Sequence, residues 1–379
     1  MIFTEEQELF RKSVREFAEK ELAPYVPQIL ETNTIPQELY EKAAEVGIIN
    51  ANYPVEWGGL GLGQVETCII FDEICAVCAG FGMAVEITLV SGPLFLNKDM
   101  YEKYMPVLMS GKSMIAACGT SPTGQYNTPE SAPIFTKVDG GYLVNGTRVY
   151  ATNHDSFVGK VYGFDQEGNY LYGLYDRDSE GVYPQGSDLK VGLHGSHGGT
   201  VVYKDLFIPD SMMGPSKVGK TNGYYQVYTG CGAEALGVAK GIFRKALEWC
   251  KTRTHDFKPI IEMTAVHEKL AELQMKILTA ESVIYAAAEM QDKYYETGDE
   301  DLGNQWRMMA HTAKVQASEM LVPVVYECIK LFGGMGVHDP NIHHYMGDIL
   351  DYTHMDLTNE IHYGLMAELM GIKEEAIKS

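Results

Sequence analysis

Two acidic residues of this chain, Asp356 and Glu86, are considered as candidates for a catalytic base. A carboxylate removes a proton from carbon effectively only when its own pKa is raised, and removal from water raises it. Glu86 follows the apolar run Ile74–Val85, and Asp356 lies in the stretch His354–Ile361 near the C-terminus. Each residue also has a structural alternative, because Asp356 could cap the start of a helix and Glu86 could be a polar residue of the core. The residues alone leave both alternatives open.

The cysteines and histidines do not show the spacing of a metal site. Cys75 and Cys78 form a C-x-x-C pair inside the apolar run, and no second pair or nearby histidine completes a ligand set. The C-terminal histidines have no recognisable ligand spacing either: His338, His343, His344 and His354. An odd total of seven cysteines favours reduced thiols in a cytoplasm. We therefore expect core cysteines and no bound metal.

Helical periodicity marks both ends of the chain, and short strand patterns mark its middle. The predicted helices cover residues 4–23, 36–47, 64–80 and 99–110, and later 225–251, 260–297, 301–333 and 356–373. Thr4 is the predicted N-cap of the first helix. From about 113 to 210, β-branched and aromatic runs are separated by glycines. This order predicts a mostly α protein with a central β domain, divided into residues 1–112, 113–215 and 216–379.

The chain is strongly acidic. Its 379 residues include 30 Lys and Arg against 51 Asp and Glu, a net charge of −21. Such a surface repels phosphate backbones and anionic lipid, so nucleic acid and membrane are not expected as partners. The apolar run Ile74–Val85 is also too short to cross a bilayer. We expect a soluble, cytoplasmic protein.

Four short motifs occur in the order found in one enzyme family. They are Pro54–Gly61, Thr147–Asn153, Asp205–Pro209 and Leu331–Gly336. Together with the stretch around Asp356, they resemble the acyl-CoA dehydrogenases almost from end to end. The resemblance implies a helical N-terminal domain, a β-barrel-like middle domain and a C-terminal four-helix bundle. It also implies FAD, lying between the β domain and the C-terminal helices.

In the family resembled, the carboxylate near the C-terminus is a glutamate that removes the α-proton of an acyl-CoA thioester, while flavin N5 takes the β-hydride. Asp356 falls at that position, one methylene shorter, which suggests a branched or cyclic acyl group. Some relatives place the base at a position that is Val227 here, which closes that option. Glu86 is the alternative base, as in relatives that act on cyclohexane- or cyclohexene-carboxyl-CoA. The resemblance further implies a homotetramer that passes electrons to electron-transfer flavoprotein.

The resemblance assigns flavin contacts residue by residue. Thr120 matches a threonine that bonds the pyrimidine edge, Thr152 one near N5, and Tyr150 an aromatic ring packed on the flavin. Thr358 belongs to the same C-terminal motif as Asp356. Gly333 and Gly334 belong to a turn that in relatives meets the adenylate half of FAD across a subunit boundary. Arg253 falls in the adenylate-binding region, and Lys330 stands where a glutamine is usual. The alternatives are ordinary strand residues for the first group and a helix-ending turn for the glycines.

Several family arginines are missing. His194, Tyr228 and Gly347 stand at three of those positions, and arginine is the bidentate ligand of phosphate. This loss supports a second hypothesis, a non-catalytic partner subunit of a hetero-oligomeric acyl-CoA dehydrogenase. A third is a flavin oxidase resembling nitroalkane oxidase, which also uses an aspartate. That oxidase pairs its aspartate with an arginine, and none occurs between Asp356 and Lys373.

Overall fold

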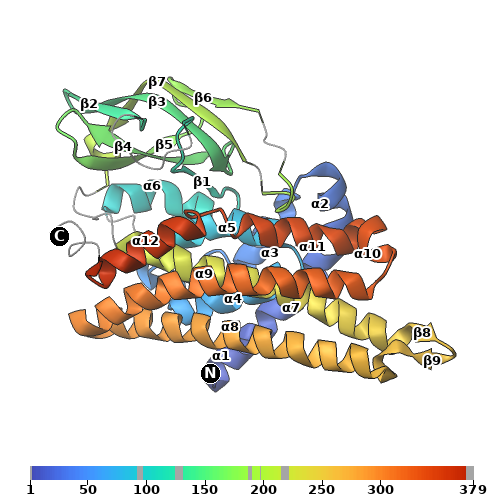
Figure 1. The fold of residues 1–379 in the computed structure, drawn as a ribbon. Coiled ribbons are helices and arrows are strands. Elements are labelled where there is room, and N and C mark those ends of the chain that lie inside the picture. The colour runs from blue at the N-terminus through green and yellow to red at the C-terminus, as the bar shows by residue number, and fades with distance from the viewer. Residues whose placement is uncertain are drawn as a thin grey trace.

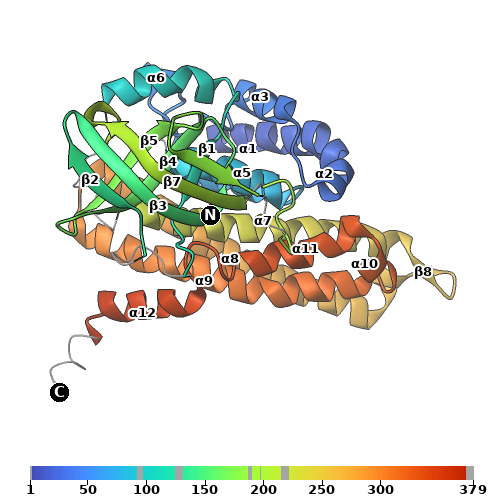
Figure 2. The same cartoon turned by 90° about the horizontal axis from the view of Figure 1, so that it is seen from above.

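The computed structural model describes residues 2–91, 97–123, 131–186, 190–196, 198–214 and 222–372. A β domain lies against one side of a helical body, with the shorter N-terminal helices and the long C-terminal helices side by side (Figures 1 and 2). The predicted class, mostly α with a central β domain, is confirmed. The N-terminal helices are α1 Glu5–Phe17, α2 Val26–Thr32, α3 Gln37–Glu45, α4 Gln64–Cys75, α5 Ala79–Ser91 and α6 Lys98–Met109.

One expected helix is in fact two. The sequence predicted a single helix over residues 64–80, but α4 ends at Cys75 and α5 begins at Ala79. The start of α5 is closely packed. A Cβ added to Gly80 would lie only 1.8 Å from the carbonyl oxygen of His194, so this position has no room for a side chain. Glu86 lies in the middle of α5.

The β domain is a seven-stranded sheet that closes on itself in part. The strand order is β1-β4-β2-β3-β7-β6, with β5 paired to β4 and an additional pairing of β1 with β3 through Ala117 and Thr152. This ring of pairings gives the barrel-like middle domain that was predicted. The strands are β1 Ile115–Cys118, β2 Ile134–Val138, β3 Gly141–Thr152, β4 Val158–Asp165, β5 Tyr170–Asp176, β6 Val182–Gln185 and β7 Gly198–Pro209.

Three long helices form most of the C-terminal bundle, and two shorter helices complete it. They are α7 Asn222–Thr252, α8 Thr264–Thr297, α9 Glu300–Leu331, α11 Pro340–Asp351 and α12 Asn359–Leu369, with the short α10 Met335–His338 and the hairpin β8 Thr254–His255 and β9 Lys258–Pro259. The sequence analysis missed α11, although Asp339 and Pro340 form an ordinary helix start. The Asp339 side chain accepts a hydrogen bond from the Asn341 amide at 2.9 Å.

The N-terminal and C-terminal helices share one hydrophobic core, whereas the β domain and α6 share a second. Cys75 and Cys78 are buried in the first core, as expected of structural cysteines. Among the described helices, none is both long enough and apolar enough to cross a bilayer.

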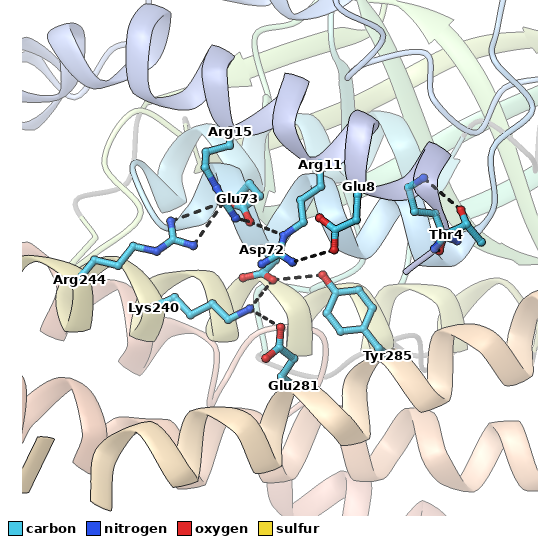
Figure 3. A network of polar contacts seen from close by, with 11 residues as sticks. Thr4, Glu8, Arg11, Arg15, Asp72, Glu73, Lys240, Arg244, Glu281 and Tyr285 are labelled. Atoms are coloured by element: carbon cyan, nitrogen blue, oxygen red, sulfur yellow. Dashed lines mark hydrogen bonds and ion pairs between the residues drawn. The ribbon is translucent and has the colours of Figure 1, made fainter. Parts of the chain in front are cut away.

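Two adjacent acidic residues of α4 join the helices through buried ion pairs (Figure 3). Glu73 accepts hydrogen bonds from Arg11 Nε at 2.8 Å and from Arg15 Nη2 at 2.6 Å. Burial opposes the ionisation of Glu73, but these bonds and the nearby charge of Arg244 outweigh it and hold its pKa at about 2. Glu73 therefore stays charged and fastens α1 to α4 and α7.

The neighbouring Asp72 points toward the bundle (Figure 3). Its Oδ2 accepts hydrogen bonds from Lys240 Nζ of α7 at 2.6 Å and from the Tyr285 hydroxyl of α8 at 3.1 Å. Lys240 also bonds Glu281 Oε1 at 2.7 Å. These contacts hold together the helices α4, α7 and α8, and α4 leads directly into α5, which carries Glu86.

Candidate active site

The end of strand β3 is attached to helix α5. Asn153, directly after the strand, donates from Nδ2 to the carbonyl oxygen of Ala84 at 2.8 Å and to that of Ile115 at 3.2 Å. Asn153 has a φ of 55°, a left-handed conformation that asparagine tolerates better than most residues. The bond to Ala84 brings the strand that carries Thr152 close to the helix that carries Glu86.

Three carboxyl groups lie near one another, on α5, on α7 and in the segment before α12, and the charge of Asp356 raises the pKa of the other two. Glu86 of α5 and Glu234 of α7 are fully buried. Neither of their carboxyl groups has a hydrogen-bond partner among the described residues, and the same is true of Asp356 Oδ2. Burial, reinforced by the charges of Glu234 and Asp356, raises the pKa of Glu86 well above its usual range. The cluster thus combines the two carboxylates that the sequence singled out with a third.

Glu234 was missed by the sequence analysis. Its packing with Glu86 is reciprocal: a Cβ added to Gly82 would lie 3.6 Å from Glu234 Oε1, and one added to Gly230 would lie 3.7 Å from Glu86 Oε1. Each glutamate therefore lies beside the glycine one helical turn before the other. The pattern that singled out Glu86, a single carboxylate in an apolar helical run, also occurs at Glu234 and could have identified it.

Asp356 lies in the connection between α11 and α12 and does not cap a helix. The predicted helix over 356–373 begins at Asn359, and Thr358 is its N-cap residue, so the capping alternative for Asp356 is wrong. Asp356 and Leu357 have φ values of 49° and 77°. Burial raises the pKa of Asp356 to about 6, against the opposing charge of Lys314. The carboxyl group thus has the raised pKa that proton removal from carbon requires.

The predicted flavin contacts of the β domain lie on adjoining strand segments. Thr152 is paired with Ala117 of β1, and Val149 bridges to Thr120. Tyr150 has a φ of 59° at an irregularity in the pairing of β3 with β7, and its side chain is 66% exposed. Thr152 is buried at the end of the strand. Two hydroxyl donors and an outward-facing ring in one region fit the polar edge and flat face of an isoalloxazine.

The other predicted FAD residues lie at the far end of the bundle from the β domain, near the β8–β9 hairpin and α10 (Figure 1). Arg253 follows α7, and its guanidinium lies 5.9 Å from the Trp249 ring centre. Gly333 has a φ of 63°, and apart from its immediate chain neighbours no atom of the described residues lies within 4 Å of a Cβ added there or at Gly334. Lys330 pairs with Glu327 at 2.9 Å. Within a single chain these four residues therefore lie apart from Thr152. The open turn at the two glycines leaves room for a ligand or a neighbouring subunit.

Thr358 lies next to the carboxyl cluster, two residues after Asp356. Its backbone carbonyl accepts a hydrogen bond from the Ile361 amide at 3.0 Å. Among the described residues, no group of three or more His, Cys, Asp and Glu side chains is arranged to hold a metal ion.

Comparison with known proteins places this site in a family. Residues 4–112 match the acyl-CoA dehydrogenase N-terminal domain, and residues 229–371 match the acyl-CoA dehydrogenase C-terminal domain. An acyl-CoA dehydrogenase of Bacillus subtilis is 25% identical over 353 residues, 89% of this chain and 90% of that protein. The CarC subunit of the caffeyl-CoA reductase-Etf complex of Acetobacterium woodii is 27% identical over 354 residues, 89% of this chain and 90% of that protein.

The solved structures agree on the fold. An acyl-CoA dehydrogenase of Bacillus anthracis, solved with FAD, aligns with a TM-score of 0.88 at 22% identity, over 99% of this chain and 68% of that one. The chain belongs to the acyl-CoA dehydrogenase family, as a diverged member. The predicted enzyme class, an acyl-CoA dehydrogenase oxidoreductase, is confirmed.

Proposed function

We propose that this enzyme dehydrogenates a branched or cyclic acyl-CoA with Asp356 as the base that removes the α-proton. The observation that supports this most is the Asp356 carboxyl group, whose Oδ2 is buried without a hydrogen-bond partner among the described residues and whose pKa burial raises to about 6. A base with that pKa is ionised at neutral pH yet stronger than an ordinary aspartate. The shorter side chain, compared with the glutamate usual in the family, leaves space for a substituent at the α-carbon.

FAD, when bound, accepts the β-hydride that leaves as the α-proton is removed. Thr120, Tyr150 and Thr152 would hold its flavin ring, and Thr358 would contact it beside the base. Arg253, Lys330, Gly333 and Gly334 would receive the adenylate half of FAD from a neighbouring subunit. The open space at the two glycines supports that arrangement, and with it a homotetramer.

Glu86 is the second candidate base. Its carboxyl group is fully buried without a hydrogen-bond partner among the described residues, so a substrate carbon could approach it without breaking an existing bond. This favours an alicyclic acyl-CoA whose acidic proton lies further from the thioester. Burial, however, favours the protonated form of Glu86, and that form cannot accept a proton.

Electron-transfer flavoprotein is the proposed electron acceptor. One relative, the Acetobacterium woodii protein, is named as a subunit of a complex with such a flavoprotein. The complex of that relative is named a reductase. Reduction of an enoyl-CoA, the reverse of the proposed dehydrogenation, is therefore also worth testing. We place the enzyme in the cytoplasm. The alternative of a non-catalytic partner subunit is opposed by the carboxyl cluster, because such a subunit has no use for unpartnered buried acids.

An anaerobic spectrum tests the proposal. We expect the purified protein to be yellow and its flavin absorbance to be bleached by isobutyryl-CoA or cyclohexanecarboxyl-CoA faster than by butyryl-CoA. A colourless protein that takes up no FAD would support the partner-subunit alternative. Bleaching by nitroethane, and by none of the three thioesters, would indicate an oxidase.

The pH dependence should identify which carboxylate is the base. Since Asp356 acts as a carboxylate, we expect the bleaching rate at low thioester concentration to rise with pH through a midpoint near 6. At pH 5 the rate should be about one-tenth of its plateau, the fraction ionised one unit below the pKa. The measurement is a stopped-flow series from pH 4.5 to 9. A midpoint clearly above 6 would instead favour Glu86, whose pKa burial raises.

A further inference from the structure

Asp356 is held in an unfavourable backbone conformation. Asp356 and Leu357 are consecutive non-glycine residues in the left-handed region, with φ values of 49° and 77°. Side chains with a Cβ adopt this region at a cost, and such conformations persist only where surrounding contacts impose them. The contacts that hold these two residues therefore decide where the carboxyl group of Asp356 points.

Two side chains from the bundle hold this segment by its backbone. Lys314 of α9 donates to the carbonyl oxygen of Leu357 at 2.8 Å and to Asn359 Oδ1 at 2.7 Å. His362 of α12 bonds through Nε2 to the carbonyl oxygen of Asp356 itself, at 3.1 Å. Lys314 and His362 are both almost completely buried, so neither bond competes with water.

The ring of His362 is fixed in turn by a second histidine. His362 Nδ1 and His311 Nδ1 of α9 lie 2.7 Å apart, a hydrogen-bond distance that requires one donor and one acceptor. Burial lowers the pKa of His311 to about 4, and burial with the charge of Lys314 lowers that of His362 to about 3. Both rings are therefore neutral at physiological pH, and each carries one N–H.

The hydrogen bonds allow one assignment of these protons. A carbonyl oxygen only accepts, so His362 Nε2 carries the hydrogen and His362 Nδ1 is bare. His311 Nδ1 is then the donor in the pair, and His311 Nε2 is the bare nitrogen. That nitrogen has no hydrogen-bond partner among the described residues, which is tolerable for an acceptor and costly for a donor.

An aromatic residue keeps the two rings in place. The Tyr228 ring stacks on His311 with centres 5.2 Å apart and meets the His362 ring edge-on at 4.5 Å. Tyr228 stands at a position where the family resemblance led us to expect arginine. In this chain, the position helps to enclose the histidine pair.

We propose that His362 is a positioning residue, which orients the Asp356 carboxylate by holding its backbone carbonyl, and that His311 sets the tautomer that His362 needs. The proposal rests on the assignment of Asp356 as the base. It adds two hydrogen bonds in series, from His311 to His362 and from His362 to the backbone carbonyl of Asp356. Neither histidine touches the substrate.

Substitutions at His362 test the geometry of the bond. Glutamine can place a donor where Nε2 lies, whereas asparagine is one methylene shorter and cannot reach the Asp356 carbonyl. We expect His362→Gln to keep kcat within about threefold and His362→Asn to lower it by about 10- to 100-fold, with KM little changed, because a misplaced base slows the chemical step. The readout is α-deuterium incorporation into isobutyryl-CoA and cyclohexanecarboxyl-CoA by the holoenzyme in D₂O.

Two further variants separate positioning from damage to the fold or to the proposed function. Tyr363→Phe removes a hydrogen bond between Tyr363 and Glu319 on the next residue of α12, and it should leave exchange unchanged. Asp356→Asn tests the base itself. Loss of exchange in Asp356→Asn with normal exchange in His362→Asn would overturn the positioning role alone, whereas normal exchange in Asp356→Asn would overturn the proposed function.

The tautomers are measured without any thioester. Solid-state ¹⁵N NMR of histidine-labelled protein, assigned by difference with His362→Gln and His311→Asn, should show a protonated Nε2 on His362 and a protonated Nδ1 on His311. In His311→Leu, which loses the donor, the His362 signals should shift and kcat should fall as in His362→Asn. A protonated Nδ1 on His362 in the unsubstituted protein, or equal kcat for the glutamine and asparagine variants, would refute the proposal.

Discussion

Replacing Asp356 with asparagine should slow the removal of the α-proton by about 10²- to 10⁴-fold, the usual contribution of a positioned general base. Asparagine preserves the size of the side chain but cannot accept the proton. The left-handed backbone also suits asparagine, so the segment should keep its shape. The measurement is α-deuterium exchange into isobutyryl-CoA and cyclohexanecarboxyl-CoA, with circular dichroism to verify the fold.

The two buried glutamates provide matched controls. Glu86→Gln and Glu234→Gln each remove an acid from the same cluster, and each should lower exchange far less than Asp356→Asn. Neither glutamate contributes to the raised pKa of Asp356, which burial sets against the charge of Lys314, so both variants should keep the pH midpoint near 6. An inactive Glu86→Gln beside an active Asp356→Asn would reverse the assignment of the base.

Replacing Lys240 with methionine should lower the free energy of unfolding by about 3–5 kcal/mol, the typical cost of removing one partner of a buried ion pair. Methionine retains the apolar stem, so the change isolates the charge. Asp72, which is completely buried, would then keep the Tyr285 hydroxyl as its hydrogen-bond donor in place of a cation. Urea unfolding followed by circular dichroism at one fixed protein concentration measures the difference.

Lys276 provides the matched control on the surface. It pairs with Glu272 at 2.9 Å on the exposed side of α8, and exposed pairs contribute little because water screens them. Lys276→Met should therefore leave the urea midpoint nearly unchanged. The double variant Lys240→Met with Asp72→Asn should recover part of the lost stability, since it removes the uncompensated buried charge. Equal midpoints for Lys240→Met and Lys276→Met would show that the buried pair does not join the helices.

Local patterns in the sequence were sufficient for the order of the helical and strand regions. Thr4 was expected to cap the first helix, and its hydroxyl does accept the Gln7 amide at 3.2 Å, while the Gln7 side chain bonds back to the Thr4 amide. Such signals work because capping and periodicity involve residues within one helical turn of each other. The division of residues 64–91 into two helices was not predicted. At the start of α5, Gly80 packs against the carbonyl oxygen of His194, and a contact between residues so far apart in the chain leaves no local pattern.

The sequence by itself determined the helix–strand–helix order, the family resemblance and the choice of Asp356 and Glu86 as candidate bases. Only the tertiary structure brought Glu234 into the same cluster, since the two glutamates meet through reciprocal glycine contacts between α5 and α7. It also decided that Asp356 lies outside the helix, in a left-handed segment held by Lys314 and His362. The physical reason is that burial and proximity set both the pKa of a carboxyl group and the direction in which it points. Those quantities depend on residues far apart in the chain.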